Sequence, residues 1–213
     1  PNRLDDNSNL NYLCAAGVCF MFLISLNKFL KKDNWFIDNN IKEPNLLNFL
    51  DLVSLGTICD VVPLIGVNRA IVKQGLKILK LKKNLGLKTL IDICNINSEL
   101  STYHIGYVLG PRINAGGRVG KCEYGANLLL NLDPKNAFML AAELNEYNKE
   151  RQLIEKKLLD EILSNIDNVN DPILILNGLN WHEGVIGIVA SRIKEKFNKP
   201  TIIISVKDNI GKA

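Results

Sequence analysis

A helical repeat of more than thirty residues dominates the second half of this chain. Asp133-Pro134 predicts its start, because aspartate caps helices and proline fits their first turn. Apolar residues then recur every three or four positions, mostly flanked by Glu and Lys: Ala137, Leu140, Leu144, Tyr147, Ile154, Leu158, Ile162 and Ile166. Such a helix would span about 45–50 Å, more than one domain needs. Since Arg151 interrupts the seam that a free coiled coil would require, the pattern predicts a connector between two lobes.

The end of the chain has two apolar runs on either side of a helical pattern. The runs are Pro172 to Leu176 and Pro200 to Val206, and the helical pattern is Gly184 to Phe197. Short connections between them predict a parallel βαβ unit with a right-handed crossover. His182 follows the first strand, where ligands of open sheets bind and where helix amides favour anions. Packing on Trp181 or capping of the helix is the alternative role for His182.

The segment from about Leu10 to Lys31 is apolar nearly all round, and Tyr12 to Leu26 carries no charge. Fifteen uncharged residues fall short of the roughly 20 that cross a bilayer. No basic region precedes them, which argues against a signal peptide. A helix that is apolar on every face is normally surrounded by other elements, so we expect a buried helix.

Leu55 to Leu64, LGTICDVVPL, places one carboxylate, Asp60, in an otherwise uncharged apolar run. A preceding helix is expected to begin near Pro44 and to end at Gly56, so that Asp60 falls in a turn. A carboxylate in apolar surroundings needs a partner, because burying an unpaired charge is costly. Asp60 is therefore either a helix cap or buried hydrogen-bond acceptor, or a metal ligand at the end of a core element.

A second helix is expected at about Val67 to Lys83, followed by helical patterns at Leu87 to Cys94 and Tyr103 to Leu109. It carries a basic stripe on its outer face, formed by Arg69, Lys73, Lys77 and Lys80. Such a stripe could follow a phosphate backbone, since charges of this kind give sequence-independent affinity for nucleic acids. An ordinary solvated face is the alternative.

Gly110 to Lys121, GPRINAGGRVGK, is rich in glycine and is expected to be a loop. It would place Arg112, Asn114 and Arg118 on backbone that can approach a ligand closely. The pattern matches neither a P-loop nor GxGxxG. Only six of the 26 basic residues are arginine, so two in one loop point to bidentate phosphate contacts. Arginines that tie the loop to neighbouring carbonyls or carboxylates are the alternative.

Composition adds little to this interpretation. The net charge of +4 only weakly favours an anionic partner, because lysine enrichment can reflect biased composition. The five cysteines are an odd number without a CxxC pair. They are expected to be small buried hydrophobes in a reducing compartment, so we expect a cytoplasmic protein.

Five segments in this order resemble one family. They are LGTICDVVPL, GVNRAIVKQGL, GPRINAGGRVG, LNEYNKERQ and WHEGVIGIVASRIKEKF. Together they are similar to the core of the RecJ exonucleases, in the DHH phosphoesterase superfamily, over essentially the whole chain. The opening PNRLDD resembles the segment that follows the Asp-His-His motif of the family. The resemblance thus implies an internal fragment without that motif and without the C-terminal part.

The resemblance implies an α/β fold in three parts. Residues 1–132 would be the C-terminal part of a DHH phosphoesterase domain, and residues 133–168 the long interdomain connecting helix. Residues 169–213 would be the first βαβ unit of a DHH-associated domain, which closes over the substrate strand.

The resemblance also assigns roles to single residues. Asp60 matches the last metal-binding aspartate of the phosphoesterase domain, which binds Mn²⁺ or Mg²⁺ in a two-metal site. Arg112, Asn114 and Arg118 match a loop beside the DNA path, and His182 matches the start of the DHH-associated domain. Gly117 stands where the family more often has alanine, a change that removes no chemical group. The fragment would retain one matched metal ligand and is expected to be inactive alone.

The implied activity is 5′-to-3′ exonuclease cleavage of single-stranded DNA, releasing 5′ mononucleotides, in DNA repair and recombination. Two alternatives stay open. One is a phosphodiesterase of the same superfamily that acts on short oligonucleotides or cyclic dinucleotides, and the other is a non-catalytic nucleic-acid-binding module. Implied partners besides single-stranded DNA are a single-strand-binding protein and a helicase, and the protein is expected to be a monomer that does not associate with membranes.

Overall fold

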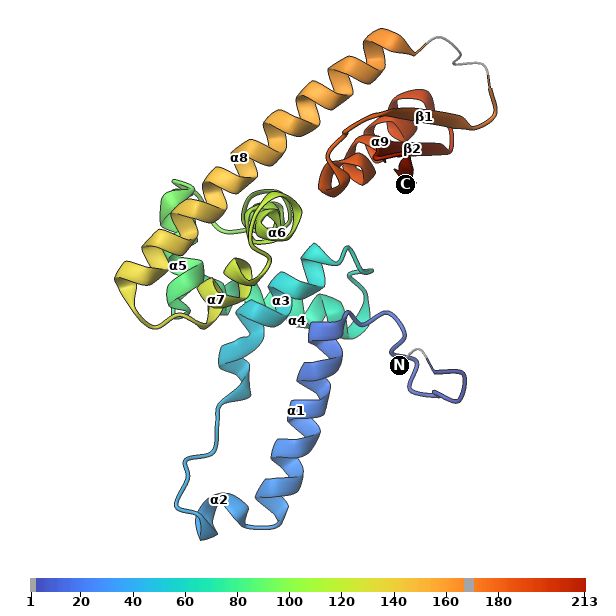
Figure 1. Ribbon diagram of the computed structural model, residues 1–213. Helices are drawn as coiled ribbons and strands as arrows, with labels where there is room; N and C mark the ends of the chain where they lie inside the picture. Colours follow the sequence, from blue (N-terminus) through green and yellow to red (C-terminus); the bar gives the residue numbers. More distant parts are fainter. Residues whose placement is uncertain (1–2, 167–170) are drawn as a thin grey trace. The chain divides into compact units, whose positions relative to one another are not determined.

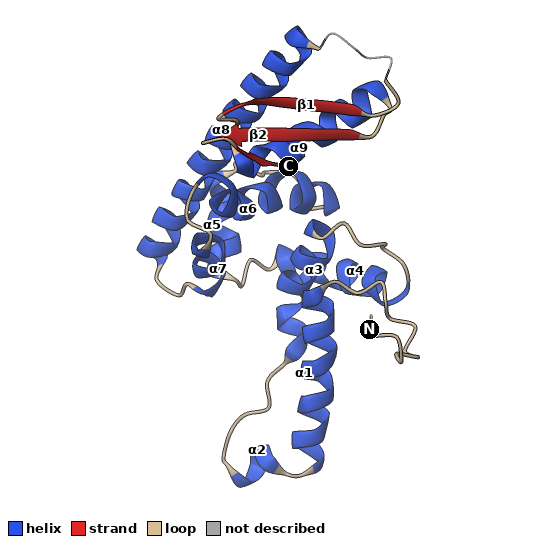
Figure 2. Ribbon diagram, turned by 45° about the vertical axis from the view of Figure 1, so that its right-hand side comes forward, coloured by secondary structure: helices blue, strands red, loops and turns tan. Residues whose placement is uncertain are grey.

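The computed structural model describes residues 3–166 and 171–213 as a mostly helical chain with one small sheet (Figures 1 and 2). The first part contains α1 (Ala15–Lys32), α2 (Trp35–Asp38), η1 (Leu46–Phe49), α3 (Leu50–Cys59), α4 (Gly66–Lys80), α5 (Leu85–Ile93) and η2 (His104–Leu109). The second part contains α6 (Gly110–Val119), α7 (Glu123–Leu130), α8 (Pro134–Asn165), β1 (Leu174–Leu179), α9 (Glu183–Phe197), β2 (Thr201–Lys207) and β3 (Ile210–Lys212). The predicted α/β class is confirmed.

The chain divides into two compact units. The first comprises Pro1–Pro111 with Leu129–Phe138, and the second comprises Arg112–Leu128 with Met139–Ala213. The boundary crosses α8, and the predicted three-part division of the chain stays a prediction. Residues 167–168 of the predicted connecting helix, and the first two residues of the segment after it, lie outside the described residues.

The core of the first unit forms where α3 packs against α1 and α4. Its buried side chains come from all of these helices and are Phe20, Leu50, Val53 and Ile71. Gly56 lies inside α3, so the prediction that it ends the helix is wrong. A Cβ atom on Gly56 would lie 2.7 Å from the Cβ of Ala16. The glycine is therefore needed for the close approach of two helices.

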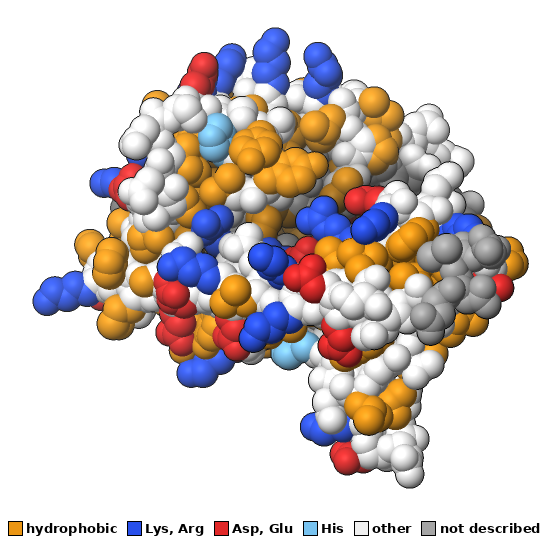
Figure 3. Space-filling view, turned by 90° about the horizontal axis from the view of Figure 1, so that it is seen from above, with side chains coloured by type: hydrophobic (Ala, Val, Ile, Leu, Met, Phe, Trp, Pro, Cys, Tyr) orange, Lys and Arg blue, Asp and Glu red, His pale blue; other side chains and the backbone are white. Residues whose placement is uncertain are grey.

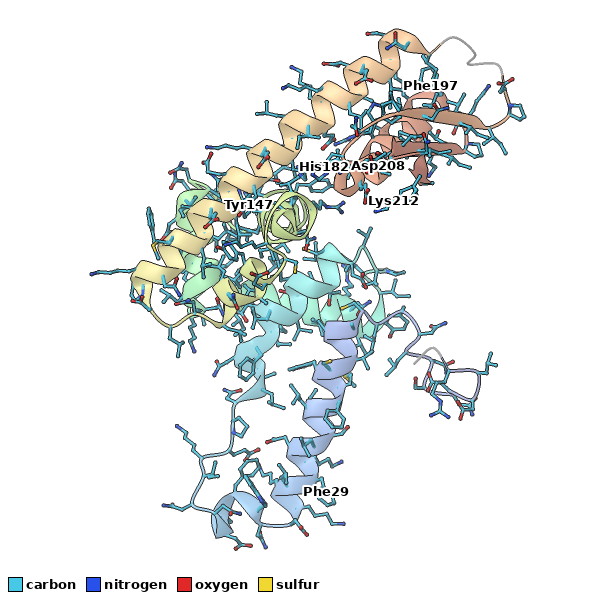
Figure 4. The ribbon with its side chains drawn as sticks, viewed as in Figure 1. Phe29, Tyr147, His182, Phe197, Asp208 and Lys212 are labelled. Carbon is cyan, nitrogen blue, oxygen red and sulfur yellow. The ribbon has the colours of Figure 1, made fainter. Side chains whose placement is uncertain are left out.

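Helix α1 is helical as predicted, but the prediction that it is buried all round is wrong. Of its residues, Gly17 and Phe20 are buried, whereas the Phe22 side chain is 65% and the Phe29 side chain 63% exposed. The described part of the chain covers only the face of α1 that packs on α3. Figure 4 labels Phe29 near the end of α1, and Figure 3 shows hydrophobic side chains at the surface beside charged ones.

The basic stripe lies on α4, which ends at Lys80 and not at Lys83. Arg69, Lys73 and Lys77 are exposed, whereas Lys80 forms an ion pair with Glu99. Exposed ion pairs contribute at most about 1 kcal/mol. The stripe is thus a largely solvated face, and a role in binding phosphates stays a prediction.

The second unit contains the predicted parallel βαβ unit. β1 and β2 pair in parallel from Leu174 opposite Thr201 to Leu179 opposite Val206, and β3 adds an antiparallel strand that the sequence pattern did not predict. One face of the sheet packs on α9 and on the C-terminal half of α8. The buried residues there are Leu158, Ile162, Leu174, Val185, Ile186, Val189, Ile193 and Ile203.

The long helix α8 extends over 32 residues, or about 48 Å. The Asp133 carboxylate accepts hydrogen bonds from the amides of Lys135 and Asn136, as expected of a cap. Arg151 interrupts the apolar seam as predicted, and its charge is balanced by Glu155 at 2.6 Å. Within residues 3–166 and 171–213, no helix is both long and apolar enough to cross a membrane.

Gly75 offers a direct test of the α3–α4 packing. A Cβ atom at Gly75 would overlap the backbone oxygen of Leu50 and lie 2.5 Å from the Cβ of Ser54. We expect Gly75→Ala to lower the free energy of unfolding by about 1–3 kcal/mol, because overpacking forces the helices apart. Denaturant unfolding would measure this change.

Gly187→Ala in α9 is the matched control, since nothing lies within 4 Å of a Cβ atom there. Alanine favours helix over glycine by about 0.5–1 kcal/mol, so this variant should be neutral or slightly more stable. Equal stability of the two variants would contradict the proposed packing.

Candidate functional site

Asp60 lies immediately after the last residue of α3. Its backbone N–H donates to the Gly56 oxygen at 3.0 Å, while its side chain is exposed. Within the described ranges, no hydrogen bond or ion pair engages its carboxylate. The prediction of a buried hydrogen-bond acceptor is therefore wrong. Both carboxylate oxygens remain available to a hard divalent cation, which prefers oxygen ligands.

The apolar residues before Asp60 explain why its side chain faces outward. Val53, Leu55 and Thr57 are buried in the body of α3, whereas Asp60 lies beyond its last residue. Cys59 is partly buried, and this burial raises the pKa of its thiol to about 11. Because a protonated thiol is a poor metal ligand, Cys59 is a poorer candidate ligand than Asp60 at this end of the helix.

The described residues provide only part of what a metal site requires. Over residues 3–166 and 171–213, no group of three or more His, Cys, Asp or Glu side chains could hold a metal ion. Asp60 has the chemistry of one ligand, and a two-metal site needs roughly four or more ligands. In the described part of the chain, Asp60 is thus a candidate for one ligand, and no complete two-metal site is present.

Gly110 to Val119 forms helix α6, so the prediction of a glycine-rich loop is wrong. The glycines serve close packing instead of turns. A Cβ atom on Gly116 would overlap the Lys121 oxygen, and one on Gly120 would lie 2.5 Å from the Tyr147 ring. Glycine is thus needed at Gly116 in α6, and at Gly120 just after it, because neighbouring groups occupy the space that a side chain would fill.

The three predicted site residues of α6 have different environments. The Arg112 Nε atom donates to the Asn145 Oδ1 atom at 2.9 Å, and the Arg112 side chain is half-buried. Asn114 is exposed. Arg118 is also exposed, and one of its terminal nitrogens donates to the Gly184 backbone oxygen at 3.1 Å. The expected contact of an arginine with a neighbouring carbonyl is thus observed for Arg118.

The end of α6 and the start of α9 touch through their backbones. A Cβ atom on Gly184 would overlap the backbone oxygen of Arg118, so glycine permits this contact. Arg118 and His182, which are 64 positions apart in sequence, are thereby brought to one place. Tertiary packing, not sequence spacing, assembles this part of the site.

His182 is the N-cap of α9, as one of its predicted alternatives stated (Figure 4). The Gly184 N–H donates to the His182 Nδ1 atom at 3.2 Å. Since Nδ1 accepts, the neutral ring carries its proton on Nε2, which can donate to a ligand. The capping geometry therefore does not exhaust the hydrogen-bonding capacity of the ring.

Arg118 and His182 border one cavity of about 490 Å³. Its lining comes from the end of α6, the start of α9 and the ends of both parallel strands, namely Gly117, Arg118, Asn180, Trp181, His182, Glu183, Gly184, Ser205 and Lys207. Glu183 is paired with Lys212 at 2.8 Å. No carboxylate within the described ranges pairs with Arg118 or Lys207. These cations, beside the N-terminus of α9, make the cavity suitable for an anion.

The sequence interpretation missed several lining residues. Ser205 is buried and donates to the Trp181 oxygen at 2.6 Å, which fixes the backbone before His182. Lys207 ends β2, and its position was accessible in principle, because the carboxyl ends of parallel strands meet at one sheet edge. Of the predicted residues, Arg118 and His182 share the cavity, whereas Arg112 and Asn114 do not line it. Asp60 belongs to the other unit.

Comparisons with known proteins agree with the predicted resemblance. No protein-family model matches the chain. The chain is 39% identical over 210 residues to the single-stranded-DNA-specific exonuclease RecJ of Escherichia coli. It is 34% identical over 191 residues to the Thermus thermophilus protein of the same name. A crystal structure of exonuclease RecJ bound to manganese superimposes on 89% of the chain, with a TM-score of 0.75 and 34% identity.

The chain belongs to the RecJ family. The match covers 95% of this chain but 36% of the E. coli RecJ protein. It covers 46% of the manganese-bound RecJ structure and 27% of the magnesium-bound RecJ from T. thermophilus, where the TM-score is 0.71 with 34% identity over 80% of this chain. The chain thus spans about a third of the length of these RecJ relatives.

The cap that His182 provides can be separated from any contact with a ligand. We expect His182→Ala to lower the free energy of unfolding by about 1 kcal/mol, because the Gly184 amide loses its acceptor. His182→Asn should retain most of this stability, since asparagine is a good cap. Thermal unfolding of both variants would measure the effect, and equal losses would show that the cap is not stabilising.

Proposed function

We propose that this chain is part of a single-stranded-DNA-specific 5′-to-3′ exonuclease that releases 5′ mononucleotides by hydrolysing phosphodiester bonds. The observation that carries the proposal is the match to RecJ in both sequence and fold over most of the chain. The exposed carboxylate of Asp60 and the cationic cavity at Arg118 supply, on separate units, the two chemistries that such a reaction needs. These are metal ligation and phosphate binding.

Asp60 is the metal ligand in this proposal, and Mn²⁺ or Mg²⁺ is the metal. RecJ structures with each ion support the choice. Two such ions would activate water and stabilise the leaving oxygen. Asp60 would hold one ion through an oxygen that no other group of the described chain engages. Since one ligand cannot hold two ions, we infer that residues 1–213 alone lack nuclease activity.

The DNA strand would be held by Arg112, Asn114, Arg118 and His182. Arg118 uses one N–H on the Gly184 oxygen, which fixes the guanidinium while its other donors remain for a phosphate. His182 can donate from Nε2 into the same cavity. Arg112 is held by Asn145 on α8 and would contribute mainly positive charge near the strand.

The cellular role, location and partners of this activity are supported by the family resemblance alone. A role in DNA repair and recombination, a cytoplasmic location and a monomeric state are predictions. The same holds for a single-strand-binding protein and a helicase as partners.

Asp60→Ala in the full-length protein tests the catalytic proposal. Cleavage of a long 5′-phosphorylated single strand should fall roughly a thousandfold, because metal stabilisation of charge is worth several kcal/mol. Single-strand binding without metal should change little, since Asp60 is exposed and unpartnered. Asp38→Ala, at another exposed aspartate on α2, is the control and should retain activity.

Two outcomes would contradict this proposal. Full cleavage by Asp60→Ala would remove Asp60 from the metal site. Preference of the unsubstituted protein for a dinucleotide over the long strand would instead indicate a phosphodiesterase of short oligonucleotides.

Arg118→Ala tests the DNA contact. We expect weaker single-strand binding, with the slope of log affinity against log salt reduced by about 0.7, the value for one phosphate contact. Lys157→Ala, at an exposed position of α8, should leave the slope unchanged. Thermal unfolding should accompany the titration because Arg118 also bonds Gly184. An unchanged slope in folded Arg118→Ala would exclude the phosphate contact.

A further inference from the structure

Val61, directly after Asp60, has an unusual backbone conformation. Its φ is +56°, in the left-handed region, where a β-branched side chain is disfavoured. In the described ranges, the other non-glycine residues at positive φ are asparagines, aspartate and lysine, namely Asn9, Asn34, Asn40, Lys82, Asn95, Asn180, Asn198, Asp208 and Asn209. Turns elsewhere therefore use residues that tolerate this conformation, and Val61 is the β-branched exception.

Packing of the Val61 side chain does not compensate for this strain. The side chain is 87% exposed. The Val61 N–H donates to the Ile58 oxygen at 3.1 Å, and the Asp60 N–H donates to the Gly56 oxygen at 3.0 Å. Two consecutive amides are therefore fixed to the last turn of α3. Strained residues persist where the surroundings determine them, and they cluster at functional sites.

The residue before Asp60 is constrained as well. The Cys59 sulfur approaches the Ile105 oxygen at 4.0 Å, in the π-helical segment η2. It also lies against Gly110, because a Cβ atom there would overlap the sulfur. All three residues belong to the first unit. The backbone of Asp60 is thus held between a packed side chain at Cys59 and a strained residue at Val61.

We propose that Val61 and the Cys59–Gly110 contact position the Asp60 carboxylate for the divalent metal. The inference rests on the proposed role of Asp60 as a metal ligand. Metal–ligand distances tolerate deviations of only about 0.2 Å. Val61 restricts its own backbone far more than glycine would, so it limits the directions in which the preceding carboxylate can point. Preorganisation of the ligand is obtained at the cost of local strain.

Val61→Gly in the full-length protein separates positioning from stability. Glycine adopts positive φ freely, so the thermal midpoint should be equal or higher. The dissociation constant for Mn²⁺, measured by calorimetry without DNA, should rise about tenfold or more, as when outer-shell groups are removed. A purely structural residue would behave in the opposite way, with a lower midpoint and unchanged affinity for Mn²⁺.

Two control variants test whether the backbone restraint at Val61 causes the expected change in Mn²⁺ affinity. Lys82→Gly places glycine at another turn with positive φ, where φ is +49°, and should leave Mn²⁺ affinity unchanged. Val61→Ala keeps a Cβ atom and should change the Mn²⁺ dissociation constant at most about threefold, well below the effect of glycine. If Val61→Ala weakens Mn²⁺ binding as much as Val61→Gly does, the isopropyl group and not the backbone restraint is responsible, and the proposal is overturned.

Gly110→Ala tests the second restraint. Its Cβ atom should displace Cys59 and weaken Mn²⁺ binding about tenfold. Cys59→Ala combined with Gly110→Ala should recover part of this loss, because the sulfur is gone while the Ile105 oxygen remains 2.9 Å from the new Cβ atom. Equal Mn²⁺ affinity in folded Gly110→Ala would overturn this part. Should the variant not fold, Val61→Gly alone decides.

The outcomes also separate this inference from the proposed function. If Asp60→Ala binds Mn²⁺ as tightly as the unsubstituted protein, the proposed role of Asp60 fails. If Asp60→Ala loses affinity while Val61→Gly does not, the metal role stands and the positioning role fails.

Discussion

Close packing of neighbouring atoms against glycines is the constraint on which both units depend. Gly56 and Gly75 let α3 lie close to α1 and α4, and Gly110 makes room for the Cys59 sulfur. In the second unit, Gly184 brings the start of α9 against the backbone of Arg118. At each of these positions a single methyl group would overlap a neighbouring atom. These contacts bring helices of the same unit close together, and the candidate site residues Asp60 and His182 lie at helix ends.

The candidate site is built from the ends of regular elements. Asp60 follows the last residue of a helix and His182 caps the first turn of another, while Lys207 ends a parallel strand. Helix ends leave backbone groups without internal partners, so they can bind ions and ligands directly. Asp60 belongs to the first unit, whereas Arg118, His182 and Lys207 belong to the second. Each part of the candidate site is therefore assembled by the packing of its own unit.

The backbone conformation of Val61, next to the candidate site residue Asp60, is unfavourable for the stability of the turn. The chain places asparagine at most of its left-handed turns, which local energetics favours. Next to the carboxylate, it has an exposed, β-branched residue in the same conformation. Local rules of turn chemistry fail at this position, and such failures are expected where function imposes a geometry of its own.

The sequence by itself determined the long helix, the parallel βαβ unit and the family, because periodicity, caps and short motifs are local. It predicted a partner for Asp60, and only the tertiary structure showed that this side chain is exposed. Only the tertiary structure decided that Gly110 to Val119 is helical, that α1 is half exposed, and that Arg118 bonds Gly184. Glycine content argues locally for a loop, yet whether a glycine turns the chain or admits a neighbour depends on what packs beside it. That neighbour comes from a distant part of the sequence, so no local pattern could reveal it.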